Sequence, residues 1–269
     1  MYIFLDLNCQ PYKIKSIVYL ILSPGNIIII MNTLIALPAY NERKDIGFII
    51  SQIKSYDLDI LVIDDGSTDG TQEQLSNIEN INTIVHEINL GYGQTIIDAF
   101  KYAISHGYDS IITMDCDGQH IPDEIQIFLS QISDYDIVSG SRYLIEANKS
   151  DPQIPPDRYA INMEITQLLN ETTKLDLTDS FCGFKAYKTA AIKKLRLTET
   201  GYGMPLQLWI QAWKSGLSIK EIPVKLIYNN AEKRFSGDLD NPTIRINYYK
   251  EIIKRESSEN SRNQATIYI

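Results

Sequence analysis

Short apolar runs alternate along the chain with longer segments in which apolar residues recur every three or four positions. The short runs are rich in β-branched residues and bounded by turn formers, which predicts buried strands at 33–37, 60–63, 83–85, 110–114 and 136–138. The longer segments predict helices near 43–55, 71–77, 94–106 and 122–132. The second half is less regular, and we expect helices and a strand at 158–172, 203–215 and 219–226. This alternation predicts an α/β fold in a single domain, with a mostly parallel sheet covered by helices on both faces.

The pattern changes at both ends of the chain. Residues 1–30 lack the regular alternation of the later residues, so we expect Met31 to be the working start and 1–30 to be an extension of doubtful role. An edge strand or a surface anchor is the alternative. Residues 31–255 form the predicted domain, and 256–269 read as a polar tail.

Composition and charge exclude several classes of protein. The 269 residues are 44% hydrophobic and 22% charged, as in ordinary globular domains. With 25 basic and 34 acidic residues the net charge is −9, which argues against nucleic acid as a partner, because phosphate backbones attract basic surfaces. Three scattered cysteines indicate reduced thiols in the cytoplasm. The most apolar stretch, 17–31, is interrupted at 23–26, so we expect no membrane span and no signal peptide.

Polar clusters come directly after three predicted strands, at 38–42, 64–67 and 115–120. Because ligands of parallel sheets bind beyond the carboxyl ends of the strands, we expect these clusters to meet at one edge. Asp115 and Asp117 are separated by one residue, so both carboxylates can reach one ion from a turn. Mg²⁺ prefers such oxygen ligands and would neutralise charge on a departing diphosphate. A turn that caps the next helix explains the same acidic pattern without a metal.

The segment 64–67, Asp-Asp-Gly-Ser, is open to two interpretations. An acidic side chain at the end of a strand can accept hydrogen bonds from a nucleobase or a ribose. The same residues are also ordinary turn formers that lead into a capped helix.

The motifs taken together resemble a known family. Four segments in this order resemble glycosyltransferase family 2, whose members are inverting enzymes with the Rossmann-like GT-A fold: 38–42, 63–71, 89–93 and 115–117. Gly140-Ser141-Arg142-Tyr143 and the segment 179–185 resemble the branch of dolichyl-phosphate or polyprenyl-phosphate mannosyl- and glucosyltransferases. The resemblance covers roughly residues 33–235.

For the nucleotide, the resemblance implies a site at the first two clusters. Pro38, Tyr40 and Glu42 would frame the nucleotide. Ile63 and Asp65 would lie against its base and ribose.

For the diphosphate, the resemblance implies a metal-assisted site. Asp115 and Asp117, helped by Gln119, would hold Mg²⁺ or Mn²⁺, with Asp117 as a catalytic residue. Cys116 stands where a small alanine is common in the family, so its main chain matters more than its thiol. Arg142 would offer its guanidinium fork to phosphate.

The resemblance implies two further assignments. Arg234, with Lys233 as the neighbouring candidate, would close over the diphosphate from a loop. Asp179 is the second predicted catalytic residue. It would orient groups near an acceptor that is already ionised, or act as general base if the acceptor is a hydroxyl.

The chain also departs from the family pattern. Gln207 stands where an acidic residue is expected, which puts an acid or base role at this position in doubt. The hydrophobic C-terminal helices of some relatives are missing, and no Gln-x-x-Arg-Trp motif is present, which speaks against a processive polysaccharide synthase. Five basic residues follow one another without an acidic residue between them: Lys185, Lys188, Lys193, Lys194 and Arg196. They form either a patch that attracts anionic lipid or the acceptor phosphate, or a solvated helix face.

These observations predict a metal-dependent hexosyltransferase of envelope glycan synthesis. It would move mannose or glucose, with inversion, from a GDP- or UDP-sugar to polyprenyl phosphate. We expect it in the cytoplasm, peripheral on the inner membrane face. Two alternatives stay open: a sugar, glycerolipid or protein hydroxyl as acceptor, and a non-catalytic protein that binds nucleotide-sugars.

Overall fold

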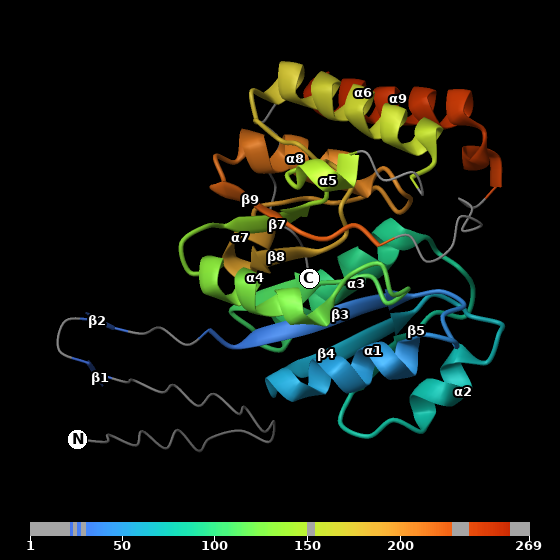
Figure 1. The fold of residues 1–269 in the computed structure, drawn as a ribbon, viewed down its shortest axis with the longest axis vertical. Coiled ribbons are helices and arrows are strands. Elements are labelled where there is room, and N and C mark those ends of the chain that lie inside the picture. The colour runs from blue at the N-terminus through green and yellow to red at the C-terminus, as the bar shows by residue number, and fades with distance from the viewer. Residues whose placement is uncertain (1–21, 24–25, 28–30, 150–153, 228–236, 259–269) are drawn as a thin grey trace.

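The computed structural model describes residues 22–23, 26–27, 31–149, 154–227 and 237–258 (Figure 1). Its main feature is a seven-stranded sheet in the order β5-β4-β3-β6-β8-β7-β9. The strands of this sheet are β3 (Thr33–Ala39), β4 (Asp59–Asp64), β5 (Asn82–Val85), β6 (Ser110–Thr113), β7 (Ile137–Ser141), β8 (Lys185–Lys188) and β9 (Ile219–Pro223). A separate antiparallel pair joins β1 (Leu22–Ser23) to β2 (Asn26–Ile27). The predicted α/β fold with a mostly parallel sheet in one domain is confirmed.

Six strands of the large sheet run parallel, and β8 runs against them between β6 and β7. The pairing sets Thr113 opposite Lys185 and Ser110 opposite Lys188. The start of β8 therefore lies at the edge where the parallel strands end. The sequence pattern did not predict β8, because four residues with a lysine at each end carry no strand signal.

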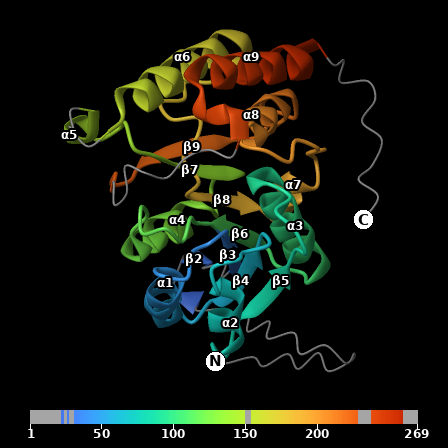
Figure 2. The same ribbon diagram turned by 90° about the vertical axis from the view of Figure 1, so that its right-hand side faces the viewer.

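The helices cover both faces of the sheet (Figure 2). They are α1 (Ile46–Ile53), α2 (Thr71–Ser76), α3 (Tyr92–Ser105), α4 (Ile125–Gln131), α5 (Glu146–Lys149), α6 (Pro156–Thr173), α7 (Thr189–Ile192), α8 (Met204–Lys214) and α9 (Pro242–Ser258). Short 3₁₀ turns are η1 (Lys54–Tyr56), η2 (Pro122–Glu124) and η3 (Gly237–Asp240). The predicted helices are present, with boundaries shifted by at most three residues. The sequence pattern missed α9, which continues to Ser258, so the predicted polar tail from 256 begins too early.

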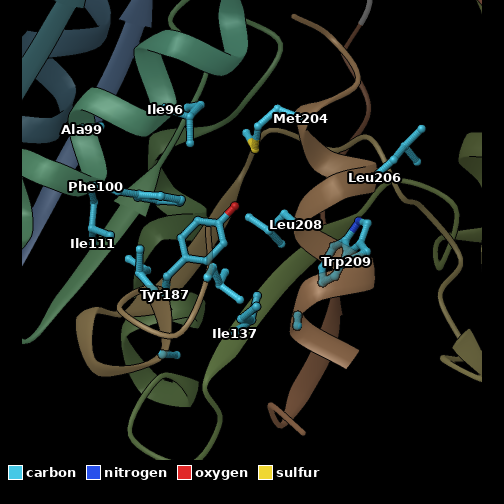
Figure 3. Packing of buried hydrophobic residues seen from close by; sticks show 14 of the residues in the cluster. Ile96, Ala99, Phe100, Ile111, Ile137, Tyr187, Met204, Leu206, Leu208 and Trp209 are labelled. Carbon is cyan, nitrogen blue, oxygen red and sulfur yellow. The ribbon is translucent and has the colours of Figure 1, made fainter. Parts of the chain in front are cut away.

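Alternate residues of the central strands point to opposite faces and divide the core in two. Leu34, Ala36 and Leu61 pack with residues of α3, α6, α8 and α9. Ile35 and Leu37 pack with residues of α1, α2 and α4. Figure 3 shows the first cluster, where side chains of α8 face those of α3 across Tyr187 of β8. Both faces of β3 and β4 are thus covered by apolar side chains.

None of the described helices combines the length and the apolar character needed to cross a membrane.

Candidate active site

The loops after the parallel strands are bonded to one another at one edge of the sheet. The backbone N–H of Asn41 donates to Ser67 Oγ at 2.8 Å, and the N–H of Thr68 donates back to Asn41 Oδ1 at 2.8 Å. The Cys116 thiol donates to the carbonyl of Pro38 at 3.0 Å. These bonds join the loops after β3, β4 and β6, so the three predicted clusters do meet.

Asp115 and Asp117 lie at this edge, in the turn after β6. The Asp115 side chain is 34% exposed. Burial, with the nearby Asp117 charge adding to it, raises the pKa of Asp115 above its usual range. A cation between two neighbouring carboxylates offsets the repulsion between their charges, so this pair fits Mg²⁺ or Mn²⁺. Gln119 joins the same turn through its backbone N–H, which donates to Asp117 Oδ1 at 3.0 Å.

Among the described residues there is no group of three or more His, Cys, Asp and Glu side chains suited to a metal. Mg²⁺ does not require one, because it is usually held by one or two carboxylates plus substrate phosphate oxygens. The donor set therefore matches an ion that completes its coordination with a bound diphosphate.

Gly183, in the segment before β8, packs closely against the Asp115 side chain. A Cβ at Gly183 would lie 2.5 Å from Asp115 Oδ2, so only glycine fits against this carboxylate. The Gly183 carbonyl accepts a hydrogen bond from Thr113 Oγ1 at 2.8 Å. The antiparallel strand thus brings Gly183 to the turn that holds Asp115 and Asp117.

His120 is a further residue of the turn after β6, and the sequence analysis assigned it no role. It is 5% exposed, and its Nδ1 accepts the backbone N–H of Asp115 at 3.1 Å. Its Nε2 lies 3.9 Å from Cys182 Sγ. Burial lowers the pKa of His120, in keeping with a neutral ring that accepts at Nδ1. His120 therefore holds the turn of Asp115 and Asp117 against the segment before β8.

Arg142 and Asp179 form a buried ion pair. Arg142 Nε and Nη2 donate to the two Asp179 oxygens at 2.6 and 2.8 Å, and Asn162 Nδ2 donates to Asp179 Oδ1 at 3.0 Å. Asp179 is 0% exposed. Although burial opposes ionisation, Arg142 outweighs it and lowers the pKa of Asp179 to about 2.

This geometry corrects two expectations for the pair. A fully buried carboxylate with so low a pKa is a poor general base, so the predicted base role of Asp179 is not supported. The Arg142 fork, expected on phosphate, is engaged by Asp179. Asp179 instead orients the Arg142 guanidinium, whose charge acts on Asp115.

In the nucleotide cluster, two predicted residues face inward. Ile63 is 0% exposed within the core, so its side chain does not reach a ligand. Asp65 is 3% exposed and accepts hydrogen bonds from His86 Nδ1 at 2.7 Å and from the backbone N–H groups of Leu90 and Gly91 at 2.8 and 2.9 Å. Asp65 therefore secures the loop before α3 and is not free to hold a ribose.

Asp64, which the sequence reasoning did not single out, is the better candidate. It ends β4 and is 1% exposed. Its Oδ1 accepts the Ser67 N–H at 3.3 Å, but its buried Oδ2 has no hydrogen-bond partner among the residues that the structure describes. Buried polar atoms are almost always paired, so an orphaned acceptor at this edge marks a place for a donor from a ligand.

The remaining predicted residues of the first cluster frame its rim. Tyr40 is 47% exposed, whereas Pro38 is half-buried in β3. The Glu42 carbonyl accepts the N–H of Ile46, the first residue of α1, and the Glu42 N–H donates to Thr71 Oγ1 at 3.0 Å. Cys116 is buried with its thiol toward Pro38, so only its main chain can line the site. Arg234 and Lys233 fall outside the described residues.

The basic run does not form one patch. Lys185 is 3% exposed, donates to the Cys182 carbonyl and lies over the Trp209 ring at 5.4 Å, so it belongs to the interior. Lys188 is the last residue of β8 and lies opposite Ser110, at the edge of the sheet where the parallel strands begin. Lys193 and Arg196 follow it in the sequence and are exposed. This position does not support contact between these surface residues and the acceptor phosphate.

With this geometry in place, the comparisons define the class of protein. Residues 34–196 match the model of glycosyl transferase family 2. The chain therefore belongs to glycosyltransferase family 2 and is a glycosyltransferase.

Two relatives and one solved structure are similar to this chain. It is 31% identical over 213 residues to UDP-N-acetylglucosamine–dolichyl-phosphate N-acetylglucosaminyltransferase of Methanococcus voltae, over 71% of this chain and 84% of that protein. It is 26% identical over 219 residues to undecaprenyl-phosphate mannosyltransferase of Micrococcus luteus, over 78% and 89%. Glucosyl-3-phosphoglycerate synthase from Mycobacterium tuberculosis, solved with Mn²⁺, UDP and phosphoglyceric acid, superimposes with a TM-score of 0.65 at 15% identity, over 86% of this chain and 80% of that one. The last likeness confirms the GT-A fold.

Proposed function

We propose that this glycosyltransferase moves a hexose, mannose or glucose, from a GDP- or UDP-sugar to polyprenyl phosphate, with inversion at the anomeric carbon. A phosphate oxygen of the acceptor attacks the anomeric carbon while the bond from that carbon to the diphosphate oxygen breaks. The nucleoside diphosphate leaves with the bonding electrons. The names of the two relatives, both transferases to lipid phosphates, support this acceptor class.

The observation that carries the choice of acceptor is the state of Asp179. A hydroxyl acceptor needs a base to remove its proton, whereas a phosphate monoester has a second pKa of about 6 and is largely ionised at neutral pH. Asp179, the predicted base, is buried, paired with Arg142 and held at a pKa of about 2. An acceptor that arrives ionised suits this site.

In the proposed reaction, Asp115 and Asp117 would hold Mg²⁺ or Mn²⁺ with help from Gln119, and the ion would supply positive charge for the leaving diphosphate. Arg142 adds a fixed positive charge near Asp115. The unpartnered Oδ2 of Asp64 accepts an N–H of the nucleobase. These residues position the donor and stabilise the leaving group, which are the main needs of this chemistry. The protein would work as a peripheral protein at the inner membrane face.

The test is a donor and acceptor screen with the full chain. GDP-mannose, UDP-glucose and UDP-N-acetylglucosamine are each incubated with Mn²⁺ and undecaprenyl phosphate in detergent, and mass spectrometry tracks lipid-linked sugar and free nucleoside diphosphate. We expect both products from one donor, and neither from the Asp117→Ala variant. Transfer to an alkyl glycoside hydroxyl without transfer to the lipid phosphate would overturn the proposed acceptor.

A further inference from the structure

Gln207 lies on α8 and is 2% exposed, with all its polar atoms bonded. Its Oε1 accepts the backbone N–H groups of Thr198 and Glu199, both at 2.8 Å. Its Nε2 donates to Thr198 Oγ1 at 3.0 Å and to Glu256 Oε1 at 2.8 Å. Gln207 thus connects the segment 198–203 to the last turn of α9.

Glu256, the residue of α9 that accepts the Gln207 amide, is also buried, with 3% of its surface exposed. Besides the Gln207 amide, it accepts Gln211 Nε2 at 3.1 Å and Arg255 Nε at 3.2 Å, while its carbonyl accepts Lys214 Nζ. Figure 2 shows α9 beside α8 on the side of the molecule beyond β9. A carboxylate buried here is tolerated because each oxygen receives donors.

The segment 198–203 is held by α9 at a second point, Glu199. Tyr248 Oη donates to Glu199 Oε1 at 2.7 Å and accepts the Gly203 N–H at 3.2 Å. Arg255 Nη2 donates to Glu199 Oε2 at 3.1 Å. Together with Gln207, these bonds fix the backbone of 198–203 at both of its ends.

The segment 198–203 packs against the start of α3 and the residues before it. The Thr200 carbonyl accepts the Gln94 N–H at 3.0 Å. A Cβ on Gly91 would lie 2.5 Å from Thr200 O, and one on Gly93 would lie 2.3 Å from Glu199 O. The loop 89–93 therefore has no room to shift toward 198–203, and its position depends on that of the segment.

The other side of the loop 89–93 belongs to the candidate site. Asp65 accepts the Leu90 and Gly91 N–H groups, and Tyr92 stacks on Tyr202 with ring centroids 6.1 Å apart. Asp65 directly follows Asp64, whose buried Oδ2 lies on the nucleotide side of the candidate site. The loop is thus held between the segment 198–203 and the donor side of the site.

We propose that Gln207 and Glu256 are positioning residues for the nucleotide-sugar: through the segment 198–203 they fix the loop 89–93, and with it the affinity for the donor. The inference deepens the proposed function, because it assigns the control of donor binding to a buried pair between α8 and α9. Asp179, the partner of Arg142, is bonded instead to Asn162 of α6 and Glu221 of β9.

The first test exchanges the two side chains. In Gln207→Glu, two buried carboxylates face each other where the Gln207–Glu256 hydrogen bond was. In Glu256→Gln, two amides face each other. In the full chain with Mn²⁺, we expect Gln207→Glu to weaken UDP or GDP binding and raise the donor KM by roughly tenfold, with the acceptor KM within about twofold of the wild type. The double variant Gln207→Glu/Glu256→Gln restores a donor facing an acceptor and should recover most of the loss. Failure of the double variant to recover donor binding would overturn the pairing.

A second test uses two milder substitutions, so that it remains interpretable if Gln207→Glu does not fold. Tyr248→Phe and Tyr108→Phe each remove a hydroxyl that donates to a carboxylate, at 2.7 Å to Glu199 and at 2.9 Å to Asp59. We expect Tyr248→Phe to raise the donor KM about threefold and Tyr108→Phe, which lies away from the segment, to leave it unchanged. Equal donor KM values in both, with reduced thermal stability alone, would show a merely structural network and refute the inference.

Calorimetry with UDP or GDP needs no acceptor, so it separates this inference from the proposed function. A wild type that binds nucleotide but transfers to no lipid phosphate contradicts the acceptor assignment alone. Unchanged nucleotide affinity in Gln207→Glu contradicts the positioning role alone.

Discussion

Replacing Asp179 by Asn tests the buried ion pair and its dependence on pH. The carboxylate is fully buried, and its pKa falls from 3.8 to about 2 in the folded protein. A tenfold change in proton affinity is worth about 1.4 kcal/mol, so the depressed pKa corresponds to roughly 2 kcal/mol of stability at neutral pH. Asn also leaves the Arg142 charge without its partner, and breaking a buried pair in this way costs about 3–5 kcal/mol.

We therefore expect Asp179→Asn to lower the free energy of unfolding at pH 7 by about 3 kcal/mol, measured by urea denaturation. Because the folded pKa lies below the unfolded one, the wild-type advantage is present above about pH 4 and is lost as the pH falls toward 2. It should shrink by about 1 kcal/mol between pH 7 and pH 3.

The control is Glu164→Gln, which breaks an ion pair with Lys250 whose side chains are 50% and 45% exposed. Exposed pairs contribute about 0–1 kcal/mol, so this variant should unfold almost as the wild type does. Equal costs for the two variants, or a cost of Asp179→Asn that stays constant down to pH 3, would refute the reasoning.

Three further predictions concern the site. Asp117→Ala should lower kcat by roughly 10²-fold or more without changing the circular dichroism spectrum, whereas the exposed Asp123→Ala should turn over normally; comparable rates would refute the metal assignment. Gly183→Ala should weaken Mn²⁺ binding about tenfold by calorimetry, because its Cβ would meet Asp115, while Gly107→Ala, with nothing within 4 Å, should leave binding intact; unchanged affinity in Gly183→Ala would contradict this contact. Asp64→Asn should weaken UDP or GDP binding, because it puts an amide NH2 group in place of an acceptor oxygen; unaltered nucleotide affinity would exclude Asp64 from the nucleotide site.

The sequence pattern predicted most of the sheet and its helices, but not which way each side chain points. Strands buried on both faces carry no alternation of apolar and polar residues, so nothing in the pattern could show that Ile63 faces the core. Asp64 and Asp65 are adjacent, and only the loop bonds to Leu90 and Gly91 reveal that Asp65 is already engaged.

The contacts that the sequence could not reveal are long-range. Arg142 and Asp179 are separated by 37 positions, and Gln207 and Glu256 by 49. No local spacing links such pairs. The helix α9 escaped notice because its sequence is mostly polar, although Tyr249 and Ile252 bury one side of it.

The antiparallel strand β8 also constrains the order of folding. Its two neighbours, β6 and β7, are complete by Ser141, but the strand that separates them begins only at Lys185. During synthesis both neighbours therefore expose unpaired backbone until more than forty further residues have left the ribosome. A nascent chain arrested in this interval presents one open edge on β6 and both edges of β7, which exposes it to aggregation and to capture by chaperones.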